Sequence, residues 1–184
     1  GSGFWEASIR CCVNKKVLHA VNGAFSKKWA KLSEDCGREV TKIEYSSGKA
    51  VKPEDVDKAL SNGSFEAFCM VHNETSTGVA SDLAAISNVM KKHNNVLWIV
   101  DAVSSLAGIK IEVDKLGIDI CLASSQKALA LPAGIAVASI SERAFKKAET
   151  VPGKGYYFDI LQLKEAYDKN ETPYTPSIPH LYAL

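Results

Sequence analysis

The feature that most constrains the fold is a regular alternation between short apolar segments and amphipathic segments. Apolar and β-branched residues predict six strands, at 16–21, 38–45, 65–72, 96–100, 118–124 and 134–140. Helical spacing predicts five helices between or beside them, at 4–12, 24–36, 53–62, 82–94 and 141–149. Strands that are apolar throughout are typical of a parallel sheet with helices on both faces. We therefore predict an α/β fold with a mainly parallel sheet.

Helix-capping and helix-breaking residues support these boundaries. Pro53 suits the first turn of one helix, Gly37 the end of another, and Ser81 is expected to cap the helix that starts at residue 82. The tail 172–180, with three prolines, is expected to be irregular.

Composition excludes several classes of protein. The 22 basic and 21 acidic residues are dispersed and leave a formal charge of +1, so neither nucleic acid nor a membrane is an expected partner. The apolar segments are too short to span a bilayer. The five cysteines lack CxxC spacing and are expected to be reduced thiols of a soluble, cytoplasmic protein. The four histidines share no ligand spacing, so no metal site is expected.

Lys127 lies within an unusually apolar stretch, CLASSQKALALPAGIAVASI at 121–140. It could be a loop lysine whose stem covers Leu129 or Leu131. It could instead be a buried amine kept neutral by desolvation, which is what bond formation with a carbonyl compound requires. The lysine alone does not decide between them.

Polar clusters follow four of the predicted strands, at 22–26, 72–78, 101–105 and 124–127. Ligands of parallel α/β sheets bind beyond the carboxyl ends of the strands, where these clusters are expected to meet. Each has an ordinary explanation as turn chemistry. Together with the glycine-rich start of the first helix they offer an amine, a carboxylate, hydroxyls, an aromatic ring and an anion site. These are the groups that hold pyridoxal 5′-phosphate.

Four segments carry a resemblance to a known family. VDAVSSL and CLASSQKAL resemble the core of class V (fold type I) pyridoxal-phosphate-dependent aminotransferases, and VHNETSTGV and YTPSIPHLYAL are similar to the alanine–glyoxylate and serine–pyruvate branch. The resemblance implies a PLP-transferase large domain with a seven-stranded type of sheet. It also implies transamination between an alanine- or serine-type amino acid and a glyoxylate- or pyruvate-type 2-oxo acid, in a homodimer with shared active sites.

The same resemblance assigns roles around the cofactor ring. Lys127 would form the internal aldimine and carry the proton between Cα and C4′. Asp101 would pair with the pyridine N–H. Val103 and Phe25 would lie against the two ring faces, and Thr75 would hydrogen-bond near O3′.

The remaining assignments concern the phosphate. Gln126 and Ser2 with Gly3 would contribute to the phosphate cup, and Tyr174 and Ser177 would reach the phosphate of the neighbouring subunit.

The resemblance also bears on domain organisation. It implies that residues 1–184 are a partial large domain, without the segment that precedes the phosphate turn and without the C-terminal small domain. That domain would supply the arginine for the substrate carboxylate, with which neither Arg38 nor Arg143 aligns. Two alternatives stay open: a cysteine desulfurase or related lyase of the same fold, and a non-catalytic α/β binding module.

Overall fold

The fold is built around one mixed β-sheet in the computed structural model, which describes residues 1–184. The sheet has six strands in the order β2-β1-β3-β6-β7-β8. Their bounds are β1 Lys16–Val21, β2 Glu39–Glu44, β3 Ala67–Val71, β6 Leu97–Asp101, β7 Ile120–Ser124 and β8 Ala136–Ile140. Only β8 is antiparallel to its neighbour, so the predicted mainly parallel sheet is confirmed.

The strand count is six rather than the seven that the resemblance implied. All six apolar segments enter the sheet, and this chain supplies no further one to it. The remaining strands, β4 Asn73–Glu74 and β5 Val79–Ala80, pair with each other as a small antiparallel hairpin beyond the end of β3.

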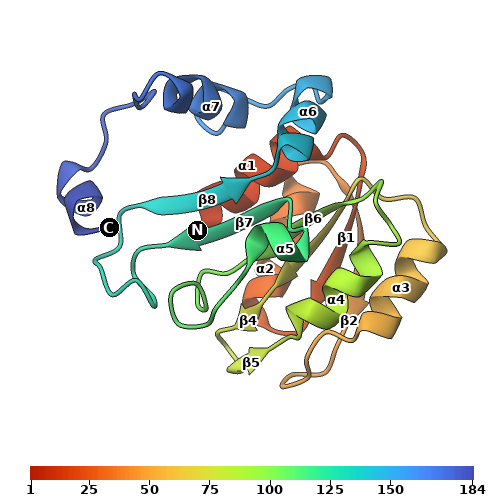
Figure 1. Ribbon diagram of the computed structural model, residues 1–184. Helices are drawn as coiled ribbons and strands as arrows, with labels where there is room; N and C mark the ends of the chain where they lie inside the picture. Colours follow the sequence, from red (N-terminus) through yellow and green to blue (C-terminus); the bar gives the residue numbers. More distant parts are fainter.

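Helices cover both faces of the sheet, as predicted (Figure 1). One face carries α1 Ser2–Cys12, α2 Ala24–Asp35, α6 Glu142–Thr150 and α7 Ile160–Asp168, and the other carries α3 Pro53–Ser61, α4 Leu83–Met90 and α5 Val113–Leu116. Successive strand residues point to opposite faces: Cys69 belongs to the first core, whereas Phe68 and Met70 belong to the second.

The residue that caps the start of α4 differs from the predicted one. Asp82 caps α4, accepting hydrogen bonds from the backbone of Ala84 and Ala85, so the expectation that Ser81 is the cap was wrong. The hydroxyl of Ser81 instead accepts a hydrogen bond from the Val51 backbone at 3.1 Å. Asp82, one residue later, reaches the first-turn N–H groups of α4. The Ser81 hydroxyl is therefore available to bind the loop before α3.

Residues 152–184, which contain α7 and α8, form a C-terminal arm along one side of the molecule (Figure 1). The predicted irregular tail is partly helical, since α8 spans Ile178–Ala183 and Pro179 is tolerated in its first turn. The arm contacts the β7–β8 turn, where His180 Nε2 lies 3.2 Å from the Pro132 carbonyl oxygen. No helix in the structure has the length and apolar character needed to cross a bilayer.

Candidate functional site

A cavity of about 120 Å³ lies at the carboxyl edge of the parallel strands. The beginnings of α1 and α2 and the ends of β3, β6 and β7 supply its walls. Seven of the ten residues that the sequence assigned to the site line it: Ser2, Phe25, Thr75, Asp101, Val103, Gln126 and Lys127. The carboxyl edge is therefore where the predicted side chains meet.

Asp101 ends the central strand β6 and is only 3% exposed. Its Oδ1 accepts a hydrogen bond from the Val103 backbone at 2.7 Å, and its Oδ2 accepts one from Trp5 Nε1 at 2.6 Å. Burial raises the pKa of Asp101 to about 6, and the two hydrogen bonds oppose that rise. The carboxylate is thus held in place by donors on its two oxygens.

Lys127 is exposed, so of the two alternatives the buried, desolvated amine was wrong and the lysine is a loop residue. Within the apolar stretch 121–140, the first residues belong to the buried strand β7, whereas residues 125–135 form the turn between β7 and β8. Ser125 closes this turn, since its N–H donates to the Ile135 carbonyl at 3.0 Å and its hydroxyl to the Pro132 carbonyl at 2.6 Å. The Lys127 ammonium then lies at the cavity mouth, 6.0 Å from the centre of the Phe25 ring.

Phe25 is placed by a carboxylate from a different loop. The fully buried Glu74 accepts hydrogen bonds from the backbone N–H groups of Phe25 and Ser26, at 3.2 and 3.0 Å, where α2 begins. Hydroxyls of Ser26 and Ser76 also donate to it, at 2.9 and 2.8 Å. Burial acts to raise the pKa of Glu74, but these donors outweigh it and the net pKa is lowered. A buried negative charge at a helix N-terminus is favourable, so Glu74 fixes the start of α2.

Hydroxyl groups form the wall between Asp101 and the β4–β5 hairpin. The hydroxyls of Thr75 and Ser104 lie 2.5 Å apart in a hydrogen bond. Thr75 is therefore at the cavity, as the sequence predicted, with a partner that the sequence did not assign.

The other three predicted site residues lie outside this cavity. Gly3, Tyr174 and Ser177 line a separate, more apolar cavity of about 430 Å³ between the body and the C-terminal arm. Tyr174 donates a hydrogen bond to the Tyr156 carbonyl at 2.9 Å. Within one subunit these residues and Lys127 do not line a common cavity.

Sequence reasoning assigned no role to five further lining residues: Gly1, Trp5, Val71, Ser104 and Ser124. The position at strand ends could have identified the two serines, because both lie within the polar clusters that follow β6 and β7. No local signal could have identified Trp5, whose partner Asp101 is 96 residues away.

The site has two features that fit a phosphate-bearing cofactor. The buried hydroxyl of Ser124 has no hydrogen-bond partner, although it lines the cavity. No side chain caps the start of α1 at the same wall, so its first N–H groups are available to an anion. Gly1 keeps this corner open, since a Cβ there would lie 3.0 Å from Val103.

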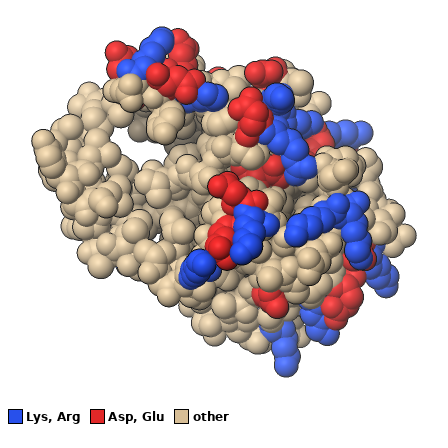
Figure 2. Space-filling model, viewed as in Figure 1, with Lys and Arg blue, Asp and Glu red and all other residues tan.

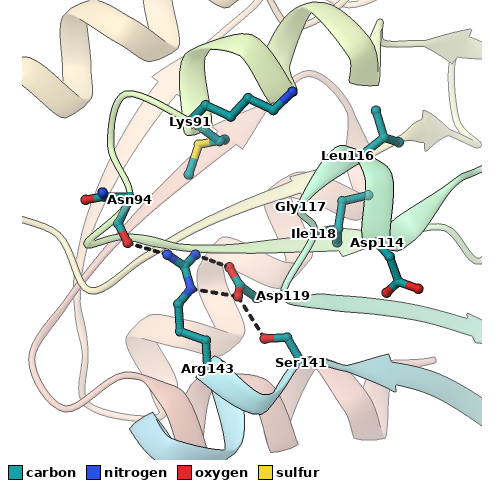
Figure 3. A pocket seen from close by; sticks show the side chains of 10 residues that line it. Lys91, Asn94, Asp114, Leu116, Gly117, Ile118, Asp119, Ser141 and Arg143 are labelled. Atoms are coloured by element: carbon teal, nitrogen blue, oxygen red, sulfur yellow. Dashed lines mark hydrogen bonds and ion pairs between the residues drawn. The ribbon is translucent and has the colours of Figure 1, made fainter.

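A larger cavity of about 420 Å³ lies at the opposite, amino edge of the sheet (Figure 3). An ion pair between Asp119 and Arg143 spans it, with Arg143 Nε 2.9 Å from Asp119 Oδ1. Arg143 also donates to the carbonyls of Asn94 and Val96. Both carboxylate oxygens of Asp119 and all three guanidinium nitrogens of Arg143 have partners within the chain, so we interpret the pair as structural.

The cysteines do not favour the desulfurase alternative. Cys11, Cys12, Cys69 and Cys121 are buried, and none of the five lines the Asp101 cavity. Burial raises the pKa of Cys11 and of Cys121 to about 11. A thiol with so high a pKa is a poor nucleophile.

Comparison with known proteins identifies the family of this chain. The family described as "Aminotransferase class-V" matches residues 13–184. An uncharacterised aminotransferase of Methanocaldococcus jannaschii is 40% identical over 172 residues, covering 92% of this chain and 44% of that protein. A serine–glyoxylate aminotransferase of Methylorubrum extorquens is 35% identical, covering 100% of this chain and 48% of that protein.

A solved structure shares the fold along almost the whole chain. The phosphoserine aminotransferase of Cytophaga hutchinsonii superposes with a TM-score of 0.91 at 35% identity, covering 99% of this chain and 50% of that one. The chain spans about half the length of the curated relatives it matches. The match over residues 13–184 and the shared fold show that the chain belongs to the class V aminotransferase family.

Proposed function

We propose that the protein transfers an amino group between an alanine- or serine-type amino acid and a glyoxylate- or pyruvate-type 2-oxo acid, using pyridoxal 5′-phosphate. One observation carries the proposal: Asp101, at the end of β6, and Lys127, in the turn after the adjacent strand β7, line one cavity beside the uncapped start of α1. Family membership supports the reaction class, and the serine–glyoxylate relative supports the substrate class.

The cofactor, when bound, supplies an aldehyde for the amino group and a ring that withdraws electrons from the substrate Cα. The exposed amine of Lys127 would hold the cofactor covalently and then move the proton at Cα. Asp101 would hold a proton on the ring nitrogen, because its carboxylate has lone pairs left beyond those that Val103 and Trp5 use.

The remaining lining residues would orient the cofactor. Val103 and the Phe25 ring would hold the ring from its two faces, and Thr75 would hydrogen-bond the ring hydroxyl. Ser2 and Gln126 would bind the phosphate at the start of α1, and Gly3, which lines the neighbouring cavity, could contribute only its backbone N–H.

We also propose a homodimer in which Tyr174 and Ser177 of one subunit complete the other subunit's phosphate site. The C-terminal arm supports this, because large apolar side chains are exposed along it, among them Tyr156, Tyr167 and Tyr182. Figure 2 shows the part of the arm around α8 without charged side chains, whereas charged side chains gather over α7 and over α3, α4 and α5. An uncharged, aromatic surface is typical of a buried contact.

We infer that residues 1–184 are part of the cofactor-binding large domain and that substrate-carboxylate recognition lies elsewhere in the full-length protein. The five free cysteines support a reducing, cytoplasmic location.

The deciding experiment is an absorption spectrum of the protein with pyridoxal 5′-phosphate, followed by borohydride reduction and peptide mapping. We expect a visible band and a pyridoxyl group on Lys127 alone. Label spread over surface lysines, with no band in the full-length protein, would support the non-catalytic module instead. A panel of alanine, serine and phosphoserine with glyoxylate or pyruvate then defines the substrates.

A further inference from the structure

Trp5 joins the first helix to the carboxylate of the central strand. Its Nε1 donates to Asp101 Oδ2 at 2.6 Å, and both side chains are buried, at 4% and 3% exposure. The indole is itself held, because it stacks on Trp29 with ring centres 5.7 Å apart and an interplanar angle of 12°. The donor that meets Asp101 therefore has little freedom to move.

The two hydrogen bonds to Asp101 act from different elements. Val103 donates to Oδ1 from the loop after β6, and Trp5 donates to Oδ2 from the first turns of α1. A carboxylate that accepts one donor on each oxygen cannot rotate without losing one of them. Without Trp5, only the neighbouring backbone would orient Asp101.

We propose that Trp5 is a positioning residue for Asp101: its indole N–H fixes and keeps ionised the carboxylate that meets the cofactor ring. This inference rests on the proposed function, which it deepens. The start of α1 is also the proposed phosphate site. One helix would therefore position both the cofactor phosphate and, through Trp5, the Asp101 carboxylate that meets the cofactor ring.

Loss of the Trp5 hydrogen bond should raise the pKa of Asp101, because the indole N–H stabilises the negatively charged carboxylate. A donor to the ionised form lowers the pKa of a carboxylate, so removing the indole N–H must raise it. Burial already raises the pKa of Asp101 to about 6. The other ionisable groups around Asp101 are Glu74, which raises its pKa, and Cys121, His72 and Lys127 on neighbouring elements.

The test is Trp5→Phe, which keeps an aromatic ring on Trp29 and removes the donor. We expect the Asp101 pKa of the cofactor-free, full-length protein, followed by infrared or ¹³C NMR, to rise by about one unit, a tenfold change in its protonation equilibrium. Cofactor binding near pH 6.5 should weaken by about threefold, because the ionised fraction of Asp101 falls by that factor, and recover toward pH 9, where Asp101 is ionised in both proteins.

Trp29→Phe is the matched control. It removes an indole N–H from the same stacked pair, but this one is buried with no hydrogen-bond partner. We expect no change in the Asp101 pKa. An equal shift in both variants, or no shift in Trp5→Phe, would overturn the proposal, because packing and not the hydrogen bond would then be responsible.

A second substitution covers the case in which Trp5→Phe does not fold. Benzothienylalanine at position 5 keeps the bicyclic shape and replaces the N–H by sulfur, and it should give the same rise in pKa. Because the pKa is measured without cofactor, the outcome is separate from the proposed function, which fails only if Lys127 does not take the label.

Discussion

Lys127 is an exposed turn residue without an ion pair, so its removal tests chemistry and not folding. We expect Lys127→Ala to abolish covalent cofactor attachment and both half-reactions, because the proton at Cα loses its base. The free energy of unfolding should stay within about 0.5 kcal/mol of the parent. Single-turnover absorbance and urea unfolding measure the two effects, with the exposed Lys28→Ala as control. Retained transamination would contradict the assignment.

Asp101→Asn tests the ring partner. We expect the cofactor to stay bound while Cα deprotonation slows by about 10² to 10⁴, because an amide does not hold a proton on the ring nitrogen. Exchange of the substrate Cα proton with deuterated water gives this rate directly. An unchanged rate would mean that another group sets ring protonation.

Asp101 should also make the free energy of unfolding of the cofactor-free protein depend on pH. Its pKa rises from 3.8 to about 6 on folding, so the native state binds the proton more tightly than the unfolded state. Stability should therefore fall between about pH 4 and pH 6, by roughly 3 kcal/mol, and stay level above that range. Because Asp101→Asn lacks this titration, its stability relative to the parent should improve by that amount as the pH rises. Parallel pH profiles from urea unfolding would refute this.

At the scale of elements, Glu74 links the β4–β5 hairpin to the start of α2. We expect Glu74→Gln to lower the free energy of unfolding by about 2 kcal/mol, because the amide loses the charge and part of the acceptor capacity that Phe25 and Ser26 use. Phe25 should shift with the helix end, so cofactor affinity should also fall. Chemical unfolding and cofactor titration test both, with the exposed Glu171→Gln as the neutral control.

The ion pair of Asp119 and Arg143 connects the start of β7 to α6, at the edge of the sheet opposite the Asp101 cavity. Arg143→Ala leaves the buried Asp119 carboxylate with only Ser141 and the Trp98 backbone as donors. We expect a loss of about 2 kcal/mol, below the value for a fully buried pair because the Arg143 side chain is 45% exposed. Cofactor affinity should not change. Arg10→Ala, which breaks a surface pair with Glu6, should cost under about 1 kcal/mol.

At the scale of the whole molecule, the C-terminal arm is the surface that a second subunit would cover. Tyr182 is 90% exposed, so Tyr182→Glu should leave the subunit folded but place a charge in the proposed contact. We expect the dimer dissociation constant to rise at least about tenfold, measured by sedimentation. Lys49→Glu, on a loop beside β2, is the control. Equal self-association of all three proteins would place the contact elsewhere.

The amino-acid sequence by itself determined the layers of this fold. Apolar runs and helical spacing are local patterns, and burial on both faces of a strand leaves no other arrangement for them. The six strands, the mainly parallel arrangement and the meeting of seven site residues at the carboxyl edge were all predictable for this reason.

Only the tertiary structure decided which side chains are buried, paired or exposed. The apolar surroundings of Lys127 suggested burial, but Ser125 closes a turn there that projects the lysine outward. Trp5 meets Asp101, and Glu74 meets the start of α2, across separations of 96 and 48 residues. Such contacts depend on how helices settle on the sheet, because a hydrogen bond requires its two atoms to come within about 3 Å, and no local pattern records that.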